Sequence, residues 1–78
     1  MDIKEKLVLY FKEHTGIDVS ADTHLIEESV IDSMGIMELI AFIEQAFSIE
    51  LDMDDLTIDN FSTIIHISNL INEKGGQE

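Results

Sequence analysis

The sequence is organised around residues 30–40, which read VIDSMGIMELI. A short polar break, Asp32 and Ser33, opens directly into the strongest amphipathic pattern of the chain. From Ser33 to Phe47 there is no proline and only one glycine, and apolar residues recur at spacings of three and four, which place one stripe on a helix. The stripe consists of Ile36, Leu39, Ile40, Ile43 and Phe47. The stretch therefore predicts a helix from about Ser33 to Phe47, with Asp32 or Ser33 as its N-cap.

A second, narrower apolar row runs along the same predicted helix. It consists of Met34, Met37 and Ala41, and it is displaced around the helix from the main stripe. We expect Leu39 and Ile43 to face a core, whereas Met34 and Met37 face water or a partner. A serine at the start of a helix, beside exposed methionines, is the feature that calls for a functional explanation.

Length and composition indicate a single folded domain, residues 1–78. The chain has no cysteine, so neither a disulfide nor thiolate ligation of zinc can hold it together, and an apolar content of 45% indicates stability from packing. No apolar run approaches the ~20 residues of a membrane span. The first residues carry charges and lack the apolar region of a signal peptide. These features favour a monomeric cytoplasmic protein.

The charge is strongly negative, with 17 acidic residues against 4 lysines and a formal net charge of −13. Such a field repels phosphate backbones and anionic lipid, which excludes nucleic acid and membrane surfaces as expected partners. It favours rapid encounter with proteins that carry basic patches. The alternative is that the acidity only keeps a small domain soluble.

The rest of the chain predicts helices on both sides of this stretch. Asp2 can cap a first helix that runs to about Thr15, where Gly16 ends it. Residues 17–32 show no period and predict a long loop laid across the core. Ser62 is expected to cap a last helix that ends near Lys74. The segment between the second and last helices is broken, with room for one short helical turn and with apolar anchors at Ile49, Leu51, Leu56 and Phe61.

The predicted fold class is therefore all-α. It is a small four-helix bundle, with three main helices, one short helix and a long loop between the first and second helices. Nothing in the sequence alternates with period two for long enough to predict a sheet.

Metal sites are not predicted. A calcium-binding loop starting at Asp52 would need glycine at its sixth position and glutamate at its twelfth, where this chain has Thr57 and Thr63. The three histidines, His14, His24 and His66, lack the spacing of metal ligands.

Ser33 itself admits three interpretations. It can be only a helix cap. It can be the nucleophile of a small hydrolase, although it lacks the Gly-x-Ser-x-Gly elbow, and so short a chain leaves little room for a shielded catalytic pocket. Its context favours the third interpretation. The triplet DSM at residues 32–34, followed by a helix carrying Glu38 and Leu39, resembles the phosphopantetheine attachment motif of acyl carrier proteins, in which the usual triplet is DSL. The resemblance covers nearly the whole chain, its length and its acidity.

This resemblance implies roles for individual residues. Ser33 would accept 4′-phosphopantetheine from coenzyme A in a reaction performed by a separate phosphopantetheinyl transferase, and Asp32 would take part in recognition by that transferase. The protein would have no catalytic residues of its own. Its arm would hold acyl or aminoacyl groups as thioesters for a loading ligase and for downstream synthases or transferases with basic docking patches. The face that these partners read would consist of Met34, Met37, Glu38, Ala41 and Glu44.

The pathway stays open at this stage. Fatty-acid, polyketide, lipid-modification and aminoacyl pathways all use freestanding carriers of this kind. Met34 replaces the common leucine, and Gly35 stands where fatty-acid carriers often have an acid, which favours a specialised carrier. An alternative function is an acidic, carrier-like interaction module that is never modified, in which Ser33 is only a cap.

Overall fold

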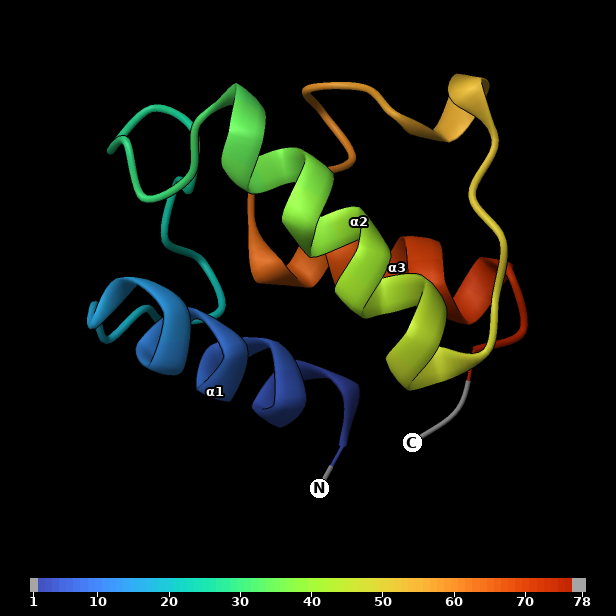
Figure 1. Ribbon diagram of the computed structural model, residues 1–78, viewed down its shortest axis with the longest axis horizontal. Coiled ribbons are helices and arrows are strands. Elements are labelled where there is room, and N and C mark those ends of the chain that lie inside the picture. Colours follow the sequence, from blue (N-terminus) through green and yellow to red (C-terminus); the bar gives the residue numbers. More distant parts are fainter. Residues whose placement is uncertain (1, 77–78) are drawn as a thin grey trace.

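The computed structural model describes residues 2–76 and their side chains, with the exception of the Ser33 side chain. Three α-helices and one short 3-10 helix follow each other along the chain (Figure 1), and no strand occurs within the described residues. The elements are α1 (Ile3–Thr15), α2 (Ser33–Phe47), η1 (Met53–Asp55) and α3 (Ile64–Glu73). The prediction of an all-helical fold with a long loop between the first two helices is confirmed. The expected short helix is a single 3-10 turn.

Both ends of α1 follow from local sequence. The Asp2 side chain accepts a hydrogen bond from the backbone N–H of Glu5 at 2.8 Å, which satisfies one of the unpaired amides of the first turn. Gly16 has φ 74° and donates its N–H to the carbonyl of Lys12. A residue in this left-handed conformation ends a helix most easily when it is glycine, because glycine has no Cβ to clash.

The start of α3 differs from the prediction by one residue. Thr63, not Ser62, is the N-cap, and its Oγ1 accepts a hydrogen bond from the backbone N–H of His66 at 3.2 Å. Ser62 instead donates its hydroxyl to the carbonyl of Asp59 at 2.9 Å, within the turn that precedes the helix. Both residue types cap helices well, so their order in the sequence could not decide between them.

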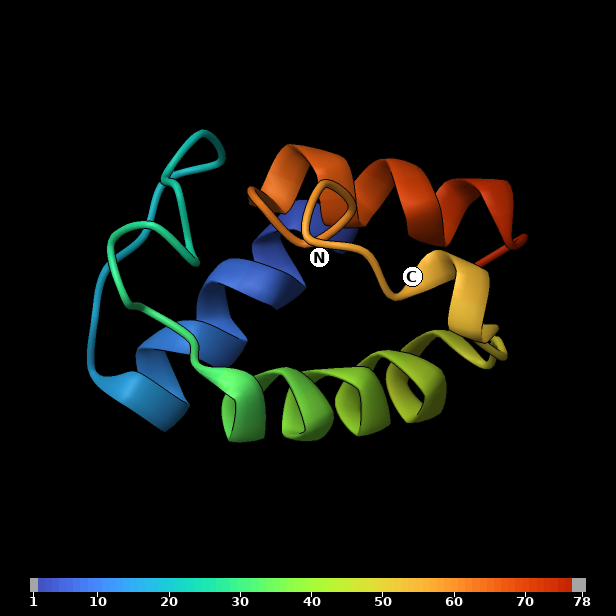
Figure 2. The same cartoon turned by 90° about the horizontal axis from the view of Figure 1, so that it is seen from above.

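The core is built from one face of each α-helix and from a few side chains of the connections. Figure 2 shows α2 and α3 along opposite sides of the molecule, and Figure 1 shows that α1 lies beside this pair. The predicted core residues Leu39 and Ile43 of α2 are fully buried. The largest fully buried side chains are Leu7, Phe11, Leu25, Leu39, Ile43, Phe61, Ile64, Ile67 and Ile71.

Two long connections complete the fold. The first, residues 16–32, buries Val19, Leu25, Val30 and Ile31. The second, residues 48–63, contains η1 and is buried at Ile49 and Phe61, whereas Leu56 is 41% exposed, so its predicted role as an anchor is wrong. No helix within residues 2–76 is long and apolar enough to cross a membrane.

Candidate functional site

The start of α2 is fixed by Asp32. Asp32 has extended backbone angles (φ −116°, ψ −171°), and its Oδ1 accepts a hydrogen bond from the backbone N–H of Gly35 at 2.7 Å. Of the two caps that the sequence allowed, Asp32 is the one used, and Ser33 is the first residue of α2. The side chain of Ser33 lies outside the described part of the structure, but its backbone stands at the positive end of the helix dipole.

The segment before α2 holds this helix start in place. Ser29 adopts the left-handed conformation (φ 59°), and the N–H groups of Val30 and Ile31 both point to the carbonyl of Leu25, at 2.8 and 3.2 Å. Val30, Ile31 and Leu25 are all buried. Because the two residues that immediately precede Asp32 are buried in the core, Ser33 is carried on a firmly attached piece of backbone.

Gly35 packs closely against the cap. A Cβ atom at this position would lie 3.3 Å from Asp32 Oδ1 and 3.6 Å from the Cβ of Ile31. Any larger residue would therefore have to displace the capping carboxylate slightly. Gly35 departs from the residue that is common in fatty-acid carriers. In the structure, the absence of a side chain at this position leaves room for the carboxylate of Asp32 to cap the helix.

A small hollow lies beside the helix start. It has a volume of about 210 Å³ and opens between the end of α1, the segment before α2 and the first turns of α2. Tyr10 lies in this hollow, where burial and then the negative charge of Glu38 hold its pKa above its ordinary value. The lining residues are Tyr10, Phe11, His14, Thr15, Ser29, Val30, Ile31, Asp32, Gly35 and Glu38. No pattern in the sequence predicts this hollow, since its residues come from three separate segments.

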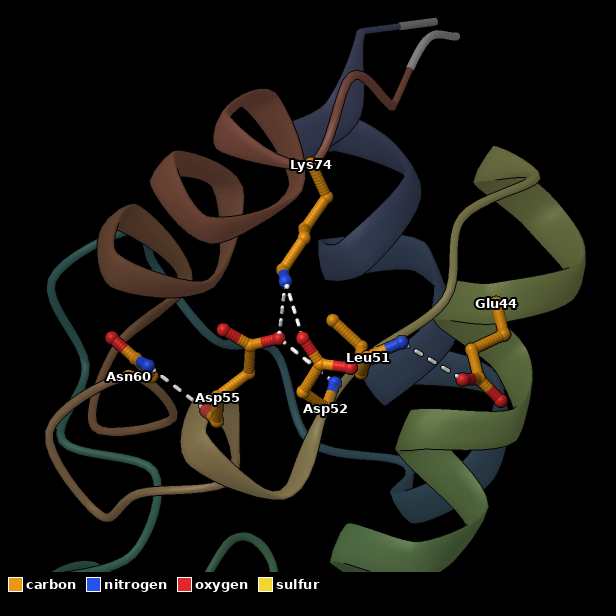
Figure 3. Close-up of polar contacts among 6 residues, drawn as sticks. All are labelled: Glu44, Leu51, Asp52, Asp55, Asn60 and Lys74. Carbon is orange, nitrogen blue, oxygen red and sulfur yellow. Dashed lines mark hydrogen bonds and ion pairs between the residues drawn. The ribbon is translucent and has the colours of Figure 1, made fainter.

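The predicted partner face is accessible over most of its length. Met34 is 78% exposed and Met37 is 70% exposed, and Glu38 and Ala41 are also exposed. Glu44 differs from these residues, because it is half-buried and its Oε2 accepts a hydrogen bond from the backbone N–H of Leu51 at 3.0 Å (Figure 3). Four of the five predicted residues thus present an open surface, whereas the carboxylate of Glu44 also holds the next connection against α2.

Further exposed apolar residues lie on the second connection and were not predicted as functional. Met53 is 88% exposed and Ile58 is 72% exposed. No period in the sequence singles them out, because residues 49–61 alternate too irregularly to show which side chains point outwards.

A cluster of charges fastens η1 to the end of α3. Lys74 Nζ lies 2.7 Å from Asp55 Oδ2 and 3.3 Å from Asp52 Oδ2 (Figure 3). Asp55 also accepts the backbone N–H of Asp52 at 2.8 Å, and the Asn60 side chain donates to the Asp55 carbonyl at 2.9 Å. Hydrogen bonding to Lys74 and then to the Asp52 amide lowers the pKa of Asp55. Hydrogen bonds to the carboxylates of Asp55 and then Asp52 raise the pKa of Lys74.

The acidic surface forms no metal centre in the part of the chain that the structure describes. Among residues 2–76 no group of three or more histidine, aspartate or glutamate side chains is arranged to hold a metal ion. Instead, two of the acids in the segment first considered for calcium, Asp52 and Asp55, are paired with Lys74.

Comparison with known proteins identifies the family. Residues 5–71 match the model of the phosphopantetheine attachment site. A D-alanyl carrier protein from Streptococcus sanguinis (strain SK36) is 35% identical over 65 residues, which cover 81% of this chain and 82% of that protein. The chain belongs to the phosphopantetheine-binding carrier proteins. Its cofactor is 4′-phosphopantetheine, which members of this family carry covalently.

Proposed function

We propose that this protein carries acyl or aminoacyl groups as thioesters on a phosphopantetheine arm joined to Ser33. The observation that carries the proposal is the position of this serine. Ser33 is the first residue of α2, directly after the Asp32 cap and before the exposed Met34, within the matched residues 5–71. When bound, the arm supplies a thiol at the end of a flexible chain.

The residues around Ser33 suit this attachment. A phosphate ester at the first position of a helix lies where the dipole favours negative charge. The neighbouring Asp32 and Met34 are exposed, so a transferase can approach this end of α2 from solvent. The Asp32 cap and the buried Val30 and Ile31 fix the backbone on which the serine stands. These residues thereby orient the modified position without reacting themselves.

Partner enzymes would read the exposed row on α2. Methionine adapts its shape to different apolar surfaces, and Met34 and Met37 lie beside Glu38 on this helix. With a formal net charge of −13, the protein would be drawn to partners whose docking patches are basic. Ala41 continues the row, and Glu44 contributes less because its carboxylate is engaged by the Leu51 amide.

For the cargo, we favour a small aminoacyl group, D-alanine in particular. The similarity to a protein named as a D-alanyl carrier supports this choice, as does Gly35, which departs from the acidic residue common in fatty-acid carriers. The loading partner would be a ligase that activates the amino acid with ATP. In this arrangement the chain is a cosubstrate of other enzymes, and η1 stands in place of the third helix of a four-helix carrier.

The first experiment measures intact mass after incubation with coenzyme A, magnesium and a broad-specificity phosphopantetheinyl transferase. We expect the parent protein to gain the mass of one phosphopantetheine and Ser33→Ala to gain nothing. Ser62→Ala is the matched control, because it removes a hydroxyl elsewhere on the chain, and it should be modified like the parent. A folded parent that several unrelated transferases leave unmodified would refute the proposal.

A second experiment tests the cargo on the modified protein. Incubation with ATP and a D-alanine-activating ligase should add one alanyl group, and hydroxylamine should remove it, because hydroxylamine cleaves thioesters. Loading by a fatty-acyl ligase, with none by the aminoacyl ligase, would reject the aminoacyl cargo and leave the attachment at Ser33 intact.

The unmodified interaction module is the second candidate function. It needs only the acidic surface and the exposed row of Met34 and Met37, which a basic partner could bind without modification of Ser33. This candidate would be supported if no transferase modified the parent protein, and if the parent and the Ser33→Ala variant bound a basic partner with equal affinity.

A further inference from the structure

The described sulfur atoms of this protein lie on its surface. The chain contains four methionines and no cysteine, so every sulfur atom of the unmodified chain is a thioether. Three of the methionines belong to the described residues, and their exposed fractions are 78% for Met34, 70% for Met37 and 88% for Met53. Within residues 2–76 the buried core is aliphatic and aromatic and contains no methionine. An oxidant in solution therefore reaches these three thioethers without unfolding the protein.

Two of the three exposed thioethers stand together on α2. Met34 and Met37 are three residues apart, which makes their side chains neighbours on one face of the helix. Ala41 is the only other member of this exposed row, so the methionines supply most of its apolar surface. Met53 differs from them, because it belongs to η1, which Figures 1 and 2 both show far from the start of α2. The chain thus contains an exposed methionine that serves as an internal control.

The residue after Ser33 shows what methionine adds at this place. The motif that the chain resembles has leucine there, and leucine and methionine are close in volume and polarity. Met34 therefore offers a partner the same apolar contact, but its sulfur carries lone pairs that leucine lacks. Met37 places a second sulfur one turn further along the helix. The two residues bring chemical reactivity to the surface that partner enzymes would contact.

The relevant reaction is the oxidation of a thioether by hydrogen peroxide. A sulfur lone pair attacks one peroxide oxygen, a sulfur–oxygen bond forms as the oxygen–oxygen bond breaks, and water leaves as the reduced product. Each event adds one oxygen and converts methionine into methionine sulfoxide, which is polar and chiral. Methionine sulfoxide reductases reverse the change, with a separate enzyme for each epimer of the sulfoxide.

We propose that Met34 and Met37 form a reversible oxidation site, through which peroxide weakens the binding of partner enzymes at the start of α2. This proposal rests on the proposed function and adds a form of regulation to it. Burying a sulfoxide oxygen against an apolar surface without a hydrogen bond costs free energy, whereas burying a thioether there is favourable. Because both side chains are exposed, a reductase can reach them and restore the apolar row.

Two other properties of the protein are unaffected by this reaction. A sulfoxide carries no charge, so the formal net charge stays at −13 and the attraction to basic partners remains. Within the described residues the core contains no thioether, so oxidation leaves its packing intact. Oxidation therefore acts on the apolar contact that follows the encounter, and not on the encounter or on the fold.

The test uses the protein without its arm, with the broad-specificity phosphopantetheinyl transferase as the probe. The protein is treated with hydrogen peroxide, and catalase then removes the excess. Cleavage after glutamate and mass spectrometry locate the added oxygens, because residues 29–38 contain Met34 and Met37, whereas residues 51–73 contain Met53. We expect sulfoxides at Met34 and Met37, and a KM of the transferase for the protein that is several-fold higher after treatment, with a smaller change in kcat. An unchanged KM with both residues oxidised would overturn the proposal, as would resistance of both to peroxide that oxidises free methionine.

Variants show which methionines are responsible, and each variant is compared with itself before and after treatment. In the double variant Met34→Leu and Met37→Leu the KM should not respond to peroxide, whatever its starting value. In Met53→Leu, the matched control, the KM should rise as much as in the parent. A double variant that still responds, or a Met53→Leu variant that does not, would overturn the proposal.

Reversal and folding are checked on the oxidised parent. Treatment with both reductases should remove the added oxygens and return the KM to its starting value. The melting curve, followed by circular dichroism, should be the same before and after oxidation. A KM that stays high after the oxygens are removed would overturn the proposal, and so would a loss of folded protein large enough to explain the slower transfer.

The outcome for the untreated parent separates this proposal from the proposed function. Its intact mass after incubation with the transferase is recorded first. A folded parent that gains no arm from any transferase refutes the attachment at Ser33 and the oxidation site together. A parent that gains the arm with the same KM before and after oxidation refutes the oxidation site only.

Discussion

The two long connections of this protein are attached to the core in different ways. The first, residues 16–32, buries four aliphatic side chains, and the N–H of Leu25 donates to the carbonyl of Ser62 at 2.8 Å. In the second connection no side chain between Ile49 and Phe61 is buried. That interval is held by the half-buried Leu51, which packs against the core, and by polar contacts, of which those of Lys74 and Glu44 are the most distant in sequence.

This difference in attachment affects the parts of the molecule that each connection positions. The first leads into Asp32 and Ser33, and the burial of its aliphatic side chains, which does not depend on charge pairing, holds that end of α2. The second contains η1, which is held by Lys74 through the half-buried Asp55 and the exposed Asp52, and charge pairs near the surface are weakened by salt. A segment held in this way opens locally at a lower free energy than the core. We therefore expect the candidate attachment site to be rigid and the second connection to be the more mobile part.

The largest expected effect is the loss of stability when a buried side chain of the first connection is truncated, compared with an exposed side chain of the second. Leu25→Ala removes a fully buried side chain from the first connection, and should lower the free energy of unfolding by about 2–5 kcal/mol. Ile58→Ala, at a 72% exposed position in the second connection, should change it by less than about 0.5 kcal/mol. Urea unfolding followed by circular dichroism measures both. Similar losses in the two variants would contradict the comparison.

The next effect concerns the residue at which the second connection ends. Thr63→Ala removes the N-cap of α3 and should cost about 1 kcal/mol of unfolding free energy. Ser62→Ala removes only a hydroxyl bond within a turn and should cost less. The same urea experiment compares them. If Ser62→Ala were the more damaging variant, the assignment of the cap to Thr63 would fail.

A smaller, local effect is expected from the charge cluster. Lys74→Gln should speed amide hydrogen exchange in residues 50–60, because the bonds to Asp52 and Asp55 are lost, and leave exchange in residues 19–31 unchanged. Lys4→Gln removes the same charge from α1 and is the matched control. Uniform changes in both connections would mean that Lys74 acts only through the net charge.

The smallest expected effect is on how stability depends on pH, through the ionisation of Asp55. Because the pKa of Asp55 is lowered in the folded protein, its contact with Lys74 contributes stability above the ordinary aspartate range. That contribution is lost as the pH falls through the lowered pKa, below about 3.9. The Asp55 carboxyl carbon, followed by NMR, should titrate below that value in the parent and return toward it in Lys74→Gln. An unchanged titration would show that Lys74 does not control Asp55.

Local sequence was sufficient for α1, α2 and the candidate attachment site. The Asp2 cap, the Gly16 stop and the apolar stripe of α2 predicted both helices with their bounds, because each signal acts within four residues along the chain. The same signals allowed either Asp32 or Ser33 as the N-cap of α2, and the structure assigns the cap to Asp32 and makes Ser33 the first helical residue. The exposure of Met34 and Met37 followed from their displacement around the helix.

Tertiary structure alone decided the features that join distant segments. Asp52 and Lys74 are 22 positions apart, and Glu44 meets the amide of Leu51 only because the chain turns back after α2. The contact between the Tyr10 and Phe42 rings, whose centres are 4.5 Å apart, likewise depends on how α1 lies against α2. Periodicity shows which side of a helix faces a core, but it does not show which segment covers that side. The sequence by itself therefore determined α1, α2 and the motif that resembles a carrier attachment site, because those signals are local. Packing between segments decided how η1 is fastened and how α1 meets α2, because those contacts join residues far apart in the sequence.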